Sequence, residues 1–82
     1  MMYLVYIIQS EKDNSYYVGH TGNIENRLTE HNTKKCKYTS TKAPWKLRYI
    51  EKFETKGEAM KREDEIKRKK RKSYIEWLIN NN

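Results

Sequence analysis

Two β-type segments close to the N-terminus constrain the fold most. Residues 2–9, MYLVYIIQ, are rich in β-branched and aromatic side chains, and YYVGHT resumes the same character at Tyr16. The polar cluster SEKDNS between them is typical of a turn, so the two segments predict a hairpin. Gly19 interrupts the second segment, and it predicts a bulge or the close approach of another backbone or a ligand.

Alternation along the hairpin sorts its side chains between the two faces of a sheet. Leu4, Tyr6 and Ile8 share one face, and Tyr17 and Gly19 share a face of the second strand. If Ile8 pairs with Tyr17, then Tyr6 lies opposite Gly19 and diagonal to Tyr17. This register predicts that the ring and hydroxyl of Tyr6 are uncovered.

The middle of the chain predicts a helix, a long loop and a third strand. Asn23 is the expected N-cap of a helix over residues 24–31. The basic, polar stretch NTKKCKYTSTKAP then forms a loop ending at Pro44, and loops of this length in a compact domain are often functional. WKLRYIEKFE predicts a strand over residues 46–54.

Two capping boxes predict helices in the last third of the chain. Thr55 and Glu58 start a helix that continues through GEAMKREDEIKRK, and Ser73 and Glu76 start a short helix, YIEWLI. The order of elements is therefore β-β-α-β-α-α, an α+β pattern without repeat or linker, which predicts one domain over residues 1–82. The expected apolar stripe of the longer helix is Ala59, Met60 and Ile66.

The charge balance favours a polyanionic partner. The 82 residues include 18 lysines and arginines against 11 acidic residues, a formal net charge of +7. Nucleic acid is the simplest such partner, and charge that only maintains solubility is the alternative.

The single cysteine and the short apolar segment at the start of the sequence indicate the cellular compartment to expect. Cys36 is the one cysteine, so we expect no disulfide partner and a reducing compartment. The apolar opening MMYLVYII is too short to span a membrane and lacks a basic leader. We therefore expect a cytoplasmic protein with no membrane partner.

The first helix directs polar side chains toward the interior. Ile24 and Leu28 are four residues apart and should face a core, yet Arg27 and His31 fall on almost the same face. A domain of this size buries only a modest core, so a polar group on a core-facing position is costly.

Glu63 is a second inward polar residue, four residues after Ala59 and three before Ile66. A carboxylate on that stripe either has a function or lies at its edge or pairs with a lysine. Tyrosine donates and accepts hydrogen bonds, arginine offers a planar fork for phosphate, and glutamate binds hard divalent cations. Together with the tyrosine pair, these side chains are the parts needed to cleave a phosphodiester.

These residues resemble a known family. LVY at 4–6 and YVG at 17–19, followed by Arg27, His31 and Glu63, are similar to the GIY-YIG nuclease domain, as are the segments RLTEHN and EAMKREDEIK. The resemblance extends from Tyr3 to about Leu78 and is closest to small standalone members. It implies a three-stranded antiparallel sheet flanked by helices, and divalent-metal-dependent hydrolysis of phosphodiester bonds, normally in DNA, with Mg²⁺ or Mn²⁺.

The resemblance also implies roles for individual residues. Tyr6 is expected to activate the attacking water, and Tyr17 to orient the phosphate or the water. Arg27 is the expected catalytic arginine, and His31 matches an active-site position that holds histidine or tyrosine. Glu63 is the expected metal ligand. Gly19, the motif glycine, is expected at the nucleic acid.

His20 follows the motif glycine, where relatives often have lysine. It is expected either to help deprotonate the water or tyrosine or to be a surface residue. The family pattern also has an asparagine some twelve or more residues after the glutamate, where this chain has Ile75 to Leu78. Its supporting role is expected to pass to Lys67 or Lys72, or to be absent.

Basic residues suggest a nucleic-acid-binding surface. The run KRKKRK at 67–72 is either a clamp for the phosphate backbone or a favourable helix C-terminus. Tyr38 and Trp45 could stack on bases of a single-stranded or distorted substrate, although Trp45 is the better core candidate. The expected phosphate contacts are Lys34, Lys35, Lys37, Lys42, Lys67, Arg68, Lys69, Lys70, Arg71 and Lys72.

Three functions fit these observations. The first is an endonuclease acting on DNA, including structured or single-stranded DNA. The second is a catalytically weak nucleic-acid-binding module on the same fold, and the third is a structural accessory protein, for example at the ribosome, that uses only its charge. We expect a monomer or a weak homodimer, since so small a nuclease needs a second copy to cut both strands. Dependence on a divalent cation separates the first function from the others.

Overall fold

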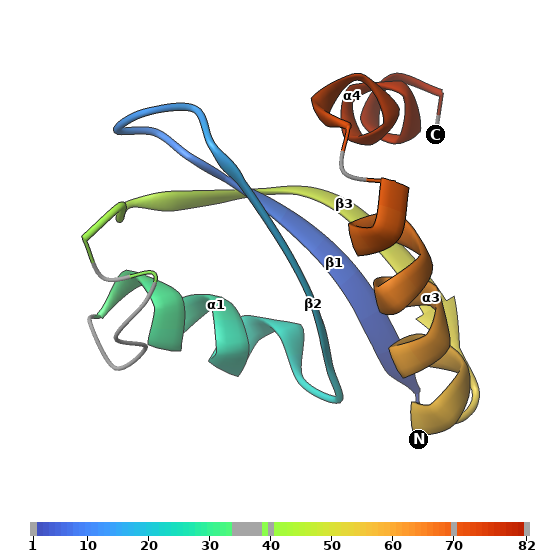
Figure 1. The fold of residues 1–82 in the computed structure, drawn as a ribbon. Helices are drawn as coiled ribbons and strands as arrows, with labels where there is room; N and C mark the ends of the chain where they lie inside the picture. Colours follow the sequence, from blue (N-terminus) through green and yellow to red (C-terminus); the bar gives the residue numbers. More distant parts are fainter. Residues whose placement is uncertain (1, 34–38, 40, 70, 82) are drawn as a thin grey trace.

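The computed structural model describes residues 2–33, 39, 41–69 and 71–81. Its elements follow the predicted order β-β-α-β-α-α, with boundaries within about one residue of those expected for the strands and the first helix. They are β1 (Tyr3–Ser10), β2 (Tyr16–Thr21), α1 (Ile24–Asn32), β3 (Trp45–Phe53), α3 (Lys56–Lys69) and α4 (Lys72–Asn80) (Figure 1).

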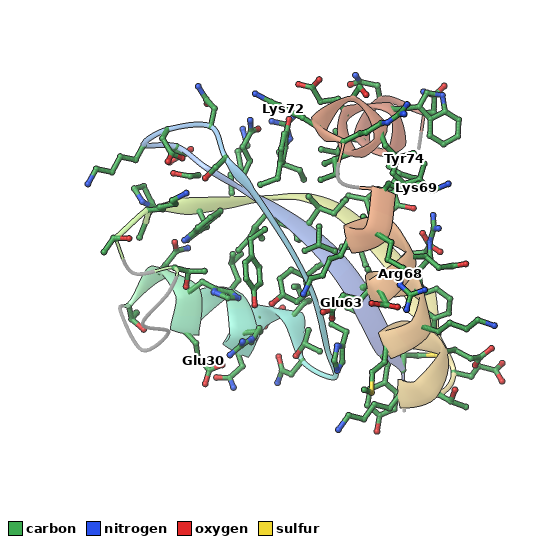
Figure 2. All side chains as sticks on the ribbon, in the orientation of Figure 1. Glu30, Glu63, Arg68, Lys69, Lys72 and Tyr74 are labelled. Carbon is green, nitrogen blue, oxygen red and sulfur yellow. The ribbon has the colours of Figure 1, made fainter. Side chains whose placement is uncertain are left out.

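The three strands form one antiparallel sheet in the order β2-β1-β3, so β2 is an edge strand. The predicted register of the hairpin is confirmed: Ile8 pairs with Tyr17, and Tyr6 pairs with Gly19. Helix α1 lies on one face of the sheet and α3 and α4 lie on the other (Figure 1). Side chains fill the space between the sheet and the helices on both faces (Figure 2). The expected α+β fold with helices on both sides is therefore confirmed.

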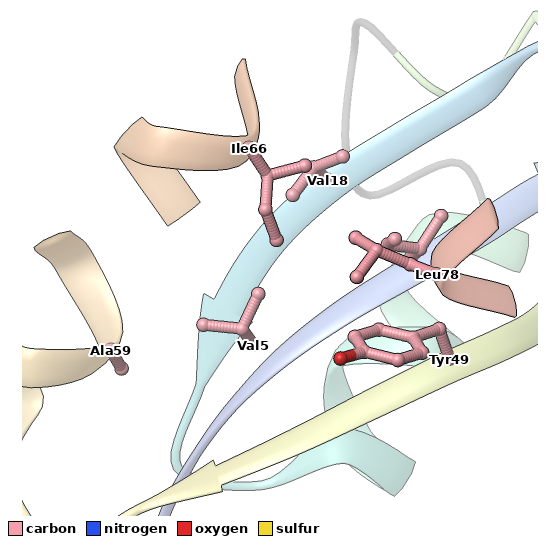
Figure 3. Packing of buried hydrophobic residues seen from close by; sticks show 7 residues of the cluster. Val5, Val18, Tyr49, Ala59, Ile66 and Leu78 are labelled. Atoms are coloured by element: carbon pink, nitrogen blue, oxygen red, sulfur yellow. The ribbon is translucent and has the colours of Figure 1, made fainter. Parts of the chain in front are cut away.

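The larger core lies between the sheet and helices α3 and α4. Val5 and Ile7 of β1 are fully buried there, because alternation turns both toward these helices. Figure 3 shows this cluster, which brings side chains from the strands against one side of α3 and α4. Its other members are Val18, Tyr49, Ala59, Ile66 and Leu78.

A smaller core lies on the α1 face and contains Tyr6, Ile8 and Trp45. Strict alternation along β3 would place Trp45 and Tyr49 on one face, yet they lie in different cores. An irregularity in the β1–β3 ladder explains this, because Ile7 pairs with Tyr49 whereas the next residue, Ile8, pairs with Leu47. The extra residue reverses the faces, and this lets Trp45 close the α1 side.

Two of the three predicted helix starts are confirmed by hydrogen bonds. The Asn23 side chain accepts from the backbone N–H of Asn26 at 3.1 Å. Thr55 Oγ1 accepts from the backbone N–H of Glu58 at 3.2 Å, which is the N-cap bond of a capping box, and the Thr55 hydroxyl donates to the Glu58 carboxylate at 3.0 Å.

Two details of the α3–α4 prediction are wrong. Helix α4 starts at Lys72 after the N-cap Arg71, which makes no capping hydrogen bond through its side chain, so Ser73 already lies inside the helix and caps nothing. Met60 is 49% exposed, because the buried side of α3 is narrower than predicted and runs through Ala59 and Ile66.

Within the described part of the chain, we find no helix with the length and apolar character needed to cross a membrane.

Candidate active site

The site is organised around the close approach of Tyr6 to Gly19. A Cβ atom at Gly19 would lie 2.6 Å from the hydroxyl oxygen of Tyr6 and 2.8 Å from its Cζ atom. The glycine is therefore needed because the Tyr6 ring fills the place of a side chain. Tyr6 is only 1% exposed, so the expectation of an uncovered tyrosine is wrong. The approaching group is this side chain, not a backbone or a ligand.

The Tyr6 hydroxyl is hydrogen-bonded to the buried side chain of His31. His31 Nε2 lies 2.9 Å from the Tyr6 hydroxyl, and its Nδ1 lies 2.7 Å from Thr39 Oγ1. The indole N–H of Trp45 donates to the Thr39 carbonyl at 2.9 Å, which fixes Thr39 in turn. An imidazole protonated on Nδ1 satisfies this arrangement, because it donates to Thr39 and accepts from Tyr6.

Thr39 was not predicted as part of the site. It is 1% exposed and lies between α1 and β3, where its backbone is helical and not in the expected loop conformation. No periodicity or capping pattern in that polar stretch distinguishes Thr39 from the neighbouring hydroxyl residues. Only the folded contact with His31 identifies it.

Burial lowers the pKa of His31 below its usual 6.5, and the positive charge of Arg27 acts in the same direction. The unfolded chain therefore binds a proton on this residue more readily than the folded chain. We expect the free energy of unfolding to be fully present above about pH 6.5 and to fall as the pH drops from there toward the pKa of folded His31.

NMR titration of the two imidazoles, combined with urea unfolding at about pH 7 and pH 5.5, tests this expectation. His20→Asn leaves a single imidazole signal and serves as the control for assignment. A His31 midpoint at or above the ordinary histidine value, with stability that does not change between the two conditions, would contradict it.

Arg27 approaches the Tyr6 hydroxyl from α1. Its side chain is one-third exposed and its Nη1 donates to Glu30 Oε1 at 3.2 Å. Burial is the largest effect on Tyr6 and raises its pKa, whereas a hydrogen bond from Arg27 opposes this, and the net pKa is about 12. Tyr17 completes this side of the site, with its ring centroid 6.4 Å from that of Tyr6 and 5.0 Å from that of His31.

Glu63 lies on the α3 face of the sheet, opposite the face that carries Tyr6 and Arg27. His20 pairs with Val5 and so faces α3, where its Nδ1 lies 2.5 Å from Glu63 Oε1. Lys67 donates to Glu63 Oε2 at 2.6 Å. Burial would raise the pKa of Glu63, but the hydrogen bonds from Lys67 and His20 outweigh it and hold the pKa below its usual 4.5.

Two interactions link the α1 side of the site with the α3 side across the edge strand β2. The charge of Glu63 raises the pKa of Tyr6, and Lys67 Nζ lies 5.9 Å from the centroid of the Tyr17 ring. Both interactions join side chains that lie on opposite faces of the edge strand β2. The structure thus brings together Tyr6, Tyr17, His20, Arg27, His31 and Glu63, all six residues expected to be catalytic.

The expected phosphate contacts are more scattered. Lys42 lies at the β1–β2 turn, 3.5 Å from the Asp13 carboxylate, and not beside the tyrosines. Arg68 pairs with Asp64 at 2.8 Å. Lys72 lies over the Tyr16 ring, 6.0 Å from its centroid. Four further expected contacts lie outside the described residues: Lys34, Lys35, Lys37 and Lys70.

The structure also places Trp45, considered for base stacking, and Asn80, considered as the family asparagine. Trp45 is 4% exposed and belongs to the core, as its alternative assignment predicted. Asn80 is exposed at the end of α4, whereas Lys67 contacts Glu63 directly. Lys67 is therefore better placed than Asn80 for the supporting role of the family asparagine.

Comparison with known proteins agrees with this geometry. A family model described as the GIY-YIG catalytic domain matches residues 2–76. The chain belongs to the GIY-YIG family. This assignment makes it a member of a nuclease family, whose substrates are nucleic acids.

Its relatives include small UPF0213 proteins. One from Staphylococcus haemolyticus is 47% identical over 75 residues and covers 90% of each chain. One from Listeria welshimeri is 47% identical over 68 residues, 82% of this chain and 76% of the relative. The solution NMR structure of a UPF0213 protein from Bacillus halodurans is 32% identical, has a TM-score of 0.63, and the match covers 100% of this chain and 86% of that one.

GIY-YIG nucleases generally depend on a divalent metal, and one carboxylate of this site is suited to hold it. Within residues 2–33, 39, 41–69 and 71–81, no three acidic, histidine or cysteine side chains form a metal cluster. Mg²⁺ needs fewer protein ligands, because it keeps several waters and binds substrate phosphates. Glu63 is ionised at neutral pH, and the half-exposed Lys67 side chain can turn away from it.

Proposed function

We propose that the chain is a divalent-metal-dependent endonuclease that hydrolyses phosphodiester bonds in structured or single-stranded DNA. The observation that carries this proposal is that the Tyr6 hydroxyl lies between Arg27 and His31, while the ionised Glu63 lies on the other side of the edge strand β2, close enough for its charge to act on Tyr6. A guanidinium, a carboxylate and a hydroxyl with its own proton acceptor are what phosphodiester hydrolysis requires.

Tyr6 and His31 form the proton path of the proposed mechanism. A tyrosine with a pKa of about 12 is a poor base unless its own proton has somewhere to go. His31 is neutral at pH 7 and lies 2.9 Å from the hydroxyl, so it takes the Tyr6 proton while Tyr6 removes one from the attacking water. Thr39 keeps the imidazole in the accepting orientation.

The other residues act on the phosphate. Arg27 neutralises charge that develops on the phosphoryl oxygens, and Tyr17 orients the phosphate or the water. Glu63 would hold Mg²⁺ or Mn²⁺, and the cation would supply positive charge to stabilise the leaving oxygen. His20 binds the Glu63 carboxylate and positions it, which supports a role as a positioning residue over a role as the base.

A binding module without efficient catalysis is the second candidate. The observation that favours it is that both Glu63 oxygens already have cationic or hydrogen-bonding partners, His20 and Lys67. In that case the Glu63 carboxylate only pairs with His20 and Lys67, on a surface that binds nucleic acid without cutting it.

Glu63→Gln separates the two candidates. We expect cleavage in Mg²⁺ to fall by roughly 100-fold or more, because the ligand charge is lost. Affinity for DNA in EDTA should stay unchanged or increase slightly, because a negative charge is removed. Glu65→Gln is the matched control, since Glu65 lies on α3 and is paired with Arg62 at 3.7 Å. Equal cleavage by the Glu63 variant and wild type, or weaker metal-free binding by the variant, would count against the assigned metal ligand.

A further inference from the structure

Trp77 is exposed although large aromatic side chains are usually buried. It is 57% exposed on α4, and its ring is stacked on Tyr74 with centroids 6.2 Å apart and planes within 15°. Burying such a ring would stabilise a small fold appreciably, so its exposure calls for an explanation. The neighbouring α4 residue Leu78, by contrast, is buried in the core.

The Tyr74 ring beneath Trp77 is held in place by cations. Lys69 Nζ lies 5.6 Å from the centroid of the Tyr74 ring, and the Arg62 guanidinium lies near the Tyr74 hydroxyl. Arg62 is itself anchored by Glu51 at 3.1 Å. We call the stacked pair, Tyr74 and Trp77, the platform; contacts to the Tyr74 ring reduce the side-chain entropy that is lost when a ligand binds.

The platform borders a hollow of about 610 Å³ at the junction of α3 and α4. Figure 2 shows Arg68, Lys69 and Tyr74 at this junction. Among the described residues, no acidic side chain lines the hollow. The lining residues are Arg68, Lys69, Arg71, Ser73, Tyr74 and Trp77.

We propose that this hollow binds an unpaired nucleotide of the DNA substrate, with its base stacked on Trp77 and its phosphate held by the arginines and lysine. Flat aromatic faces interleaved with cations are the chemistry that recognises single-stranded nucleic acid. A second copy of the chain suits the hollow less well, because it would bring its own net charge of +7 against three cations. The proposal rests on the proposed function for the class of its ligand.

Arg71 connects the hollow with a second groove that reaches two residues beside the active site, Tyr17 and Lys67. The groove has a volume of about 800 Å³ and runs beside β2. Lys67 contacts Glu63, and Lys69 lies about 9 Å from Glu63 along the axis of α3 at 1.5 Å per residue. A strand cut at Tyr6 can therefore pass along the groove and place an unpaired flanking base on Trp77.

Binding measured in EDTA tests this proposal without depending on catalysis. The probes are a thymidine oligonucleotide of about 12 nucleotides and a blunt duplex, each titrated into the protein at fixed salt. For Trp77→Ala we expect affinity for the oligonucleotide to fall roughly 5- to 100-fold and affinity for the duplex to change less than about twofold. Trp77→Phe should keep most of the affinity, because it keeps a flat ring.

The chain offers a matched control and a spectroscopic readout. Met60→Ala removes another large exposed side chain, on α3 and away from the hollow, and should not alter binding. Trp45 is buried, so quenching of intrinsic fluorescence by the oligonucleotide should come from Trp77 and disappear in Trp77→Ala.

Other occupants of the hollow give different results, and each would overturn the proposal. Unchanged oligonucleotide affinity in Trp77→Ala would do so. So would a concentration-dependent dimer that this variant abolishes, or quenching by anionic lipid vesicles but not by the oligonucleotide. If the wild-type protein binds the oligonucleotide through Trp77 but never cuts DNA, the proposed nuclease activity is overturned and the proposed nucleotide-binding hollow is not.

Discussion

Gly19→Ala is expected to destabilise the fold and to remove most of the cleavage activity. The added methyl would lie 2.6 Å from the Tyr6 hydroxyl oxygen and 2.8 Å from Cζ, so the buried ring must move. Such overpacking costs about 1–3 kcal/mol of unfolding free energy. Activity should fall further than stability, because the displaced hydroxyl loses its 2.9 Å hydrogen bond to His31.

Urea unfolding and cleavage of labelled DNA measure the two effects of Gly19→Ala. Gly57→Ala is the control, since no atom lies within 4 Å of a Cβ at Gly57 and alanine should stabilise helix α3 by about 0.5–1 kcal/mol. Combining Gly19→Ala with Tyr6→Phe removes the closest contact and should recover part of the lost stability. Wild-type stability and wild-type cleavage in Gly19→Ala would contradict the geometry described for Tyr6.

Tyr6→Phe is expected to lower the cleavage rate by roughly 10²- to 10⁴-fold, the range typical of a lost general base. The variant keeps the ring that fills the site and loses only the hydroxyl. Its unfolding free energy should fall by about 1–3 kcal/mol, because His31 Nε2 is left buried without its partner. Single-turnover cleavage at saturating protein separates the chemical step from binding.

Tyr49→Phe is a close structural match for the Tyr6 variant. Tyr49 is also buried, its pKa is also raised to about 12 by burial and by Glu51, and its hydroxyl donates to Glu51 at 2.5 Å. It lies in the core on the other face of the sheet, so its variant should lose similar stability and keep its cleavage rate. Similar rate losses in both variants would show that the Tyr6 effect is structural.

Local signals explain why much of the fold could be predicted. The hairpin register follows from alternation plus one glycine that leaves room for a tyrosine, and both pairs, Ile8 with Tyr17 and Tyr6 with Gly19, are confirmed. The caps at Asn23 and Thr55 are also local, since each depends on hydrogen bonds within three residues. Such features depend little on the rest of the molecule.

Tertiary packing decides the features that were predicted wrongly or not at all. The extra residue in β3 separates Trp45 from Tyr49, and no propensity in WKLRYIEKF marks it. Ser73 fits a capping pattern, but the chain enters α4 two residues earlier, at Arg71. Periodicity predicted that Ile75 and Leu78 form the apolar face of the last helix, and both pack into the core, but the exposure of Trp77 beside them was not predicted.

The sequence predicted which residues form the candidate site better than it predicted how they are placed relative to the sheet. Spacing on α1 predicted that His31 points inward, and it is fully buried. Spacing could not show that Glu63 lies on the opposite face of the sheet, or that the Tyr6 ring fills the space that Gly19 leaves in the edge strand. The catalytic roles of these residues stay predictions until activity is measured.

The measurement that tests the central claim most directly is cleavage by the wild-type protein. Labelled single-stranded, duplex and branched DNAs would each be incubated with Mg²⁺, with Mn²⁺ and with EDTA. The site around Tyr6 predicts cutting that requires the cation and stops in EDTA. Intact DNA in every cation condition, from a folded protein that still binds it in a salt-sensitive way, would contradict the nuclease assignment and leave a binding module on this fold.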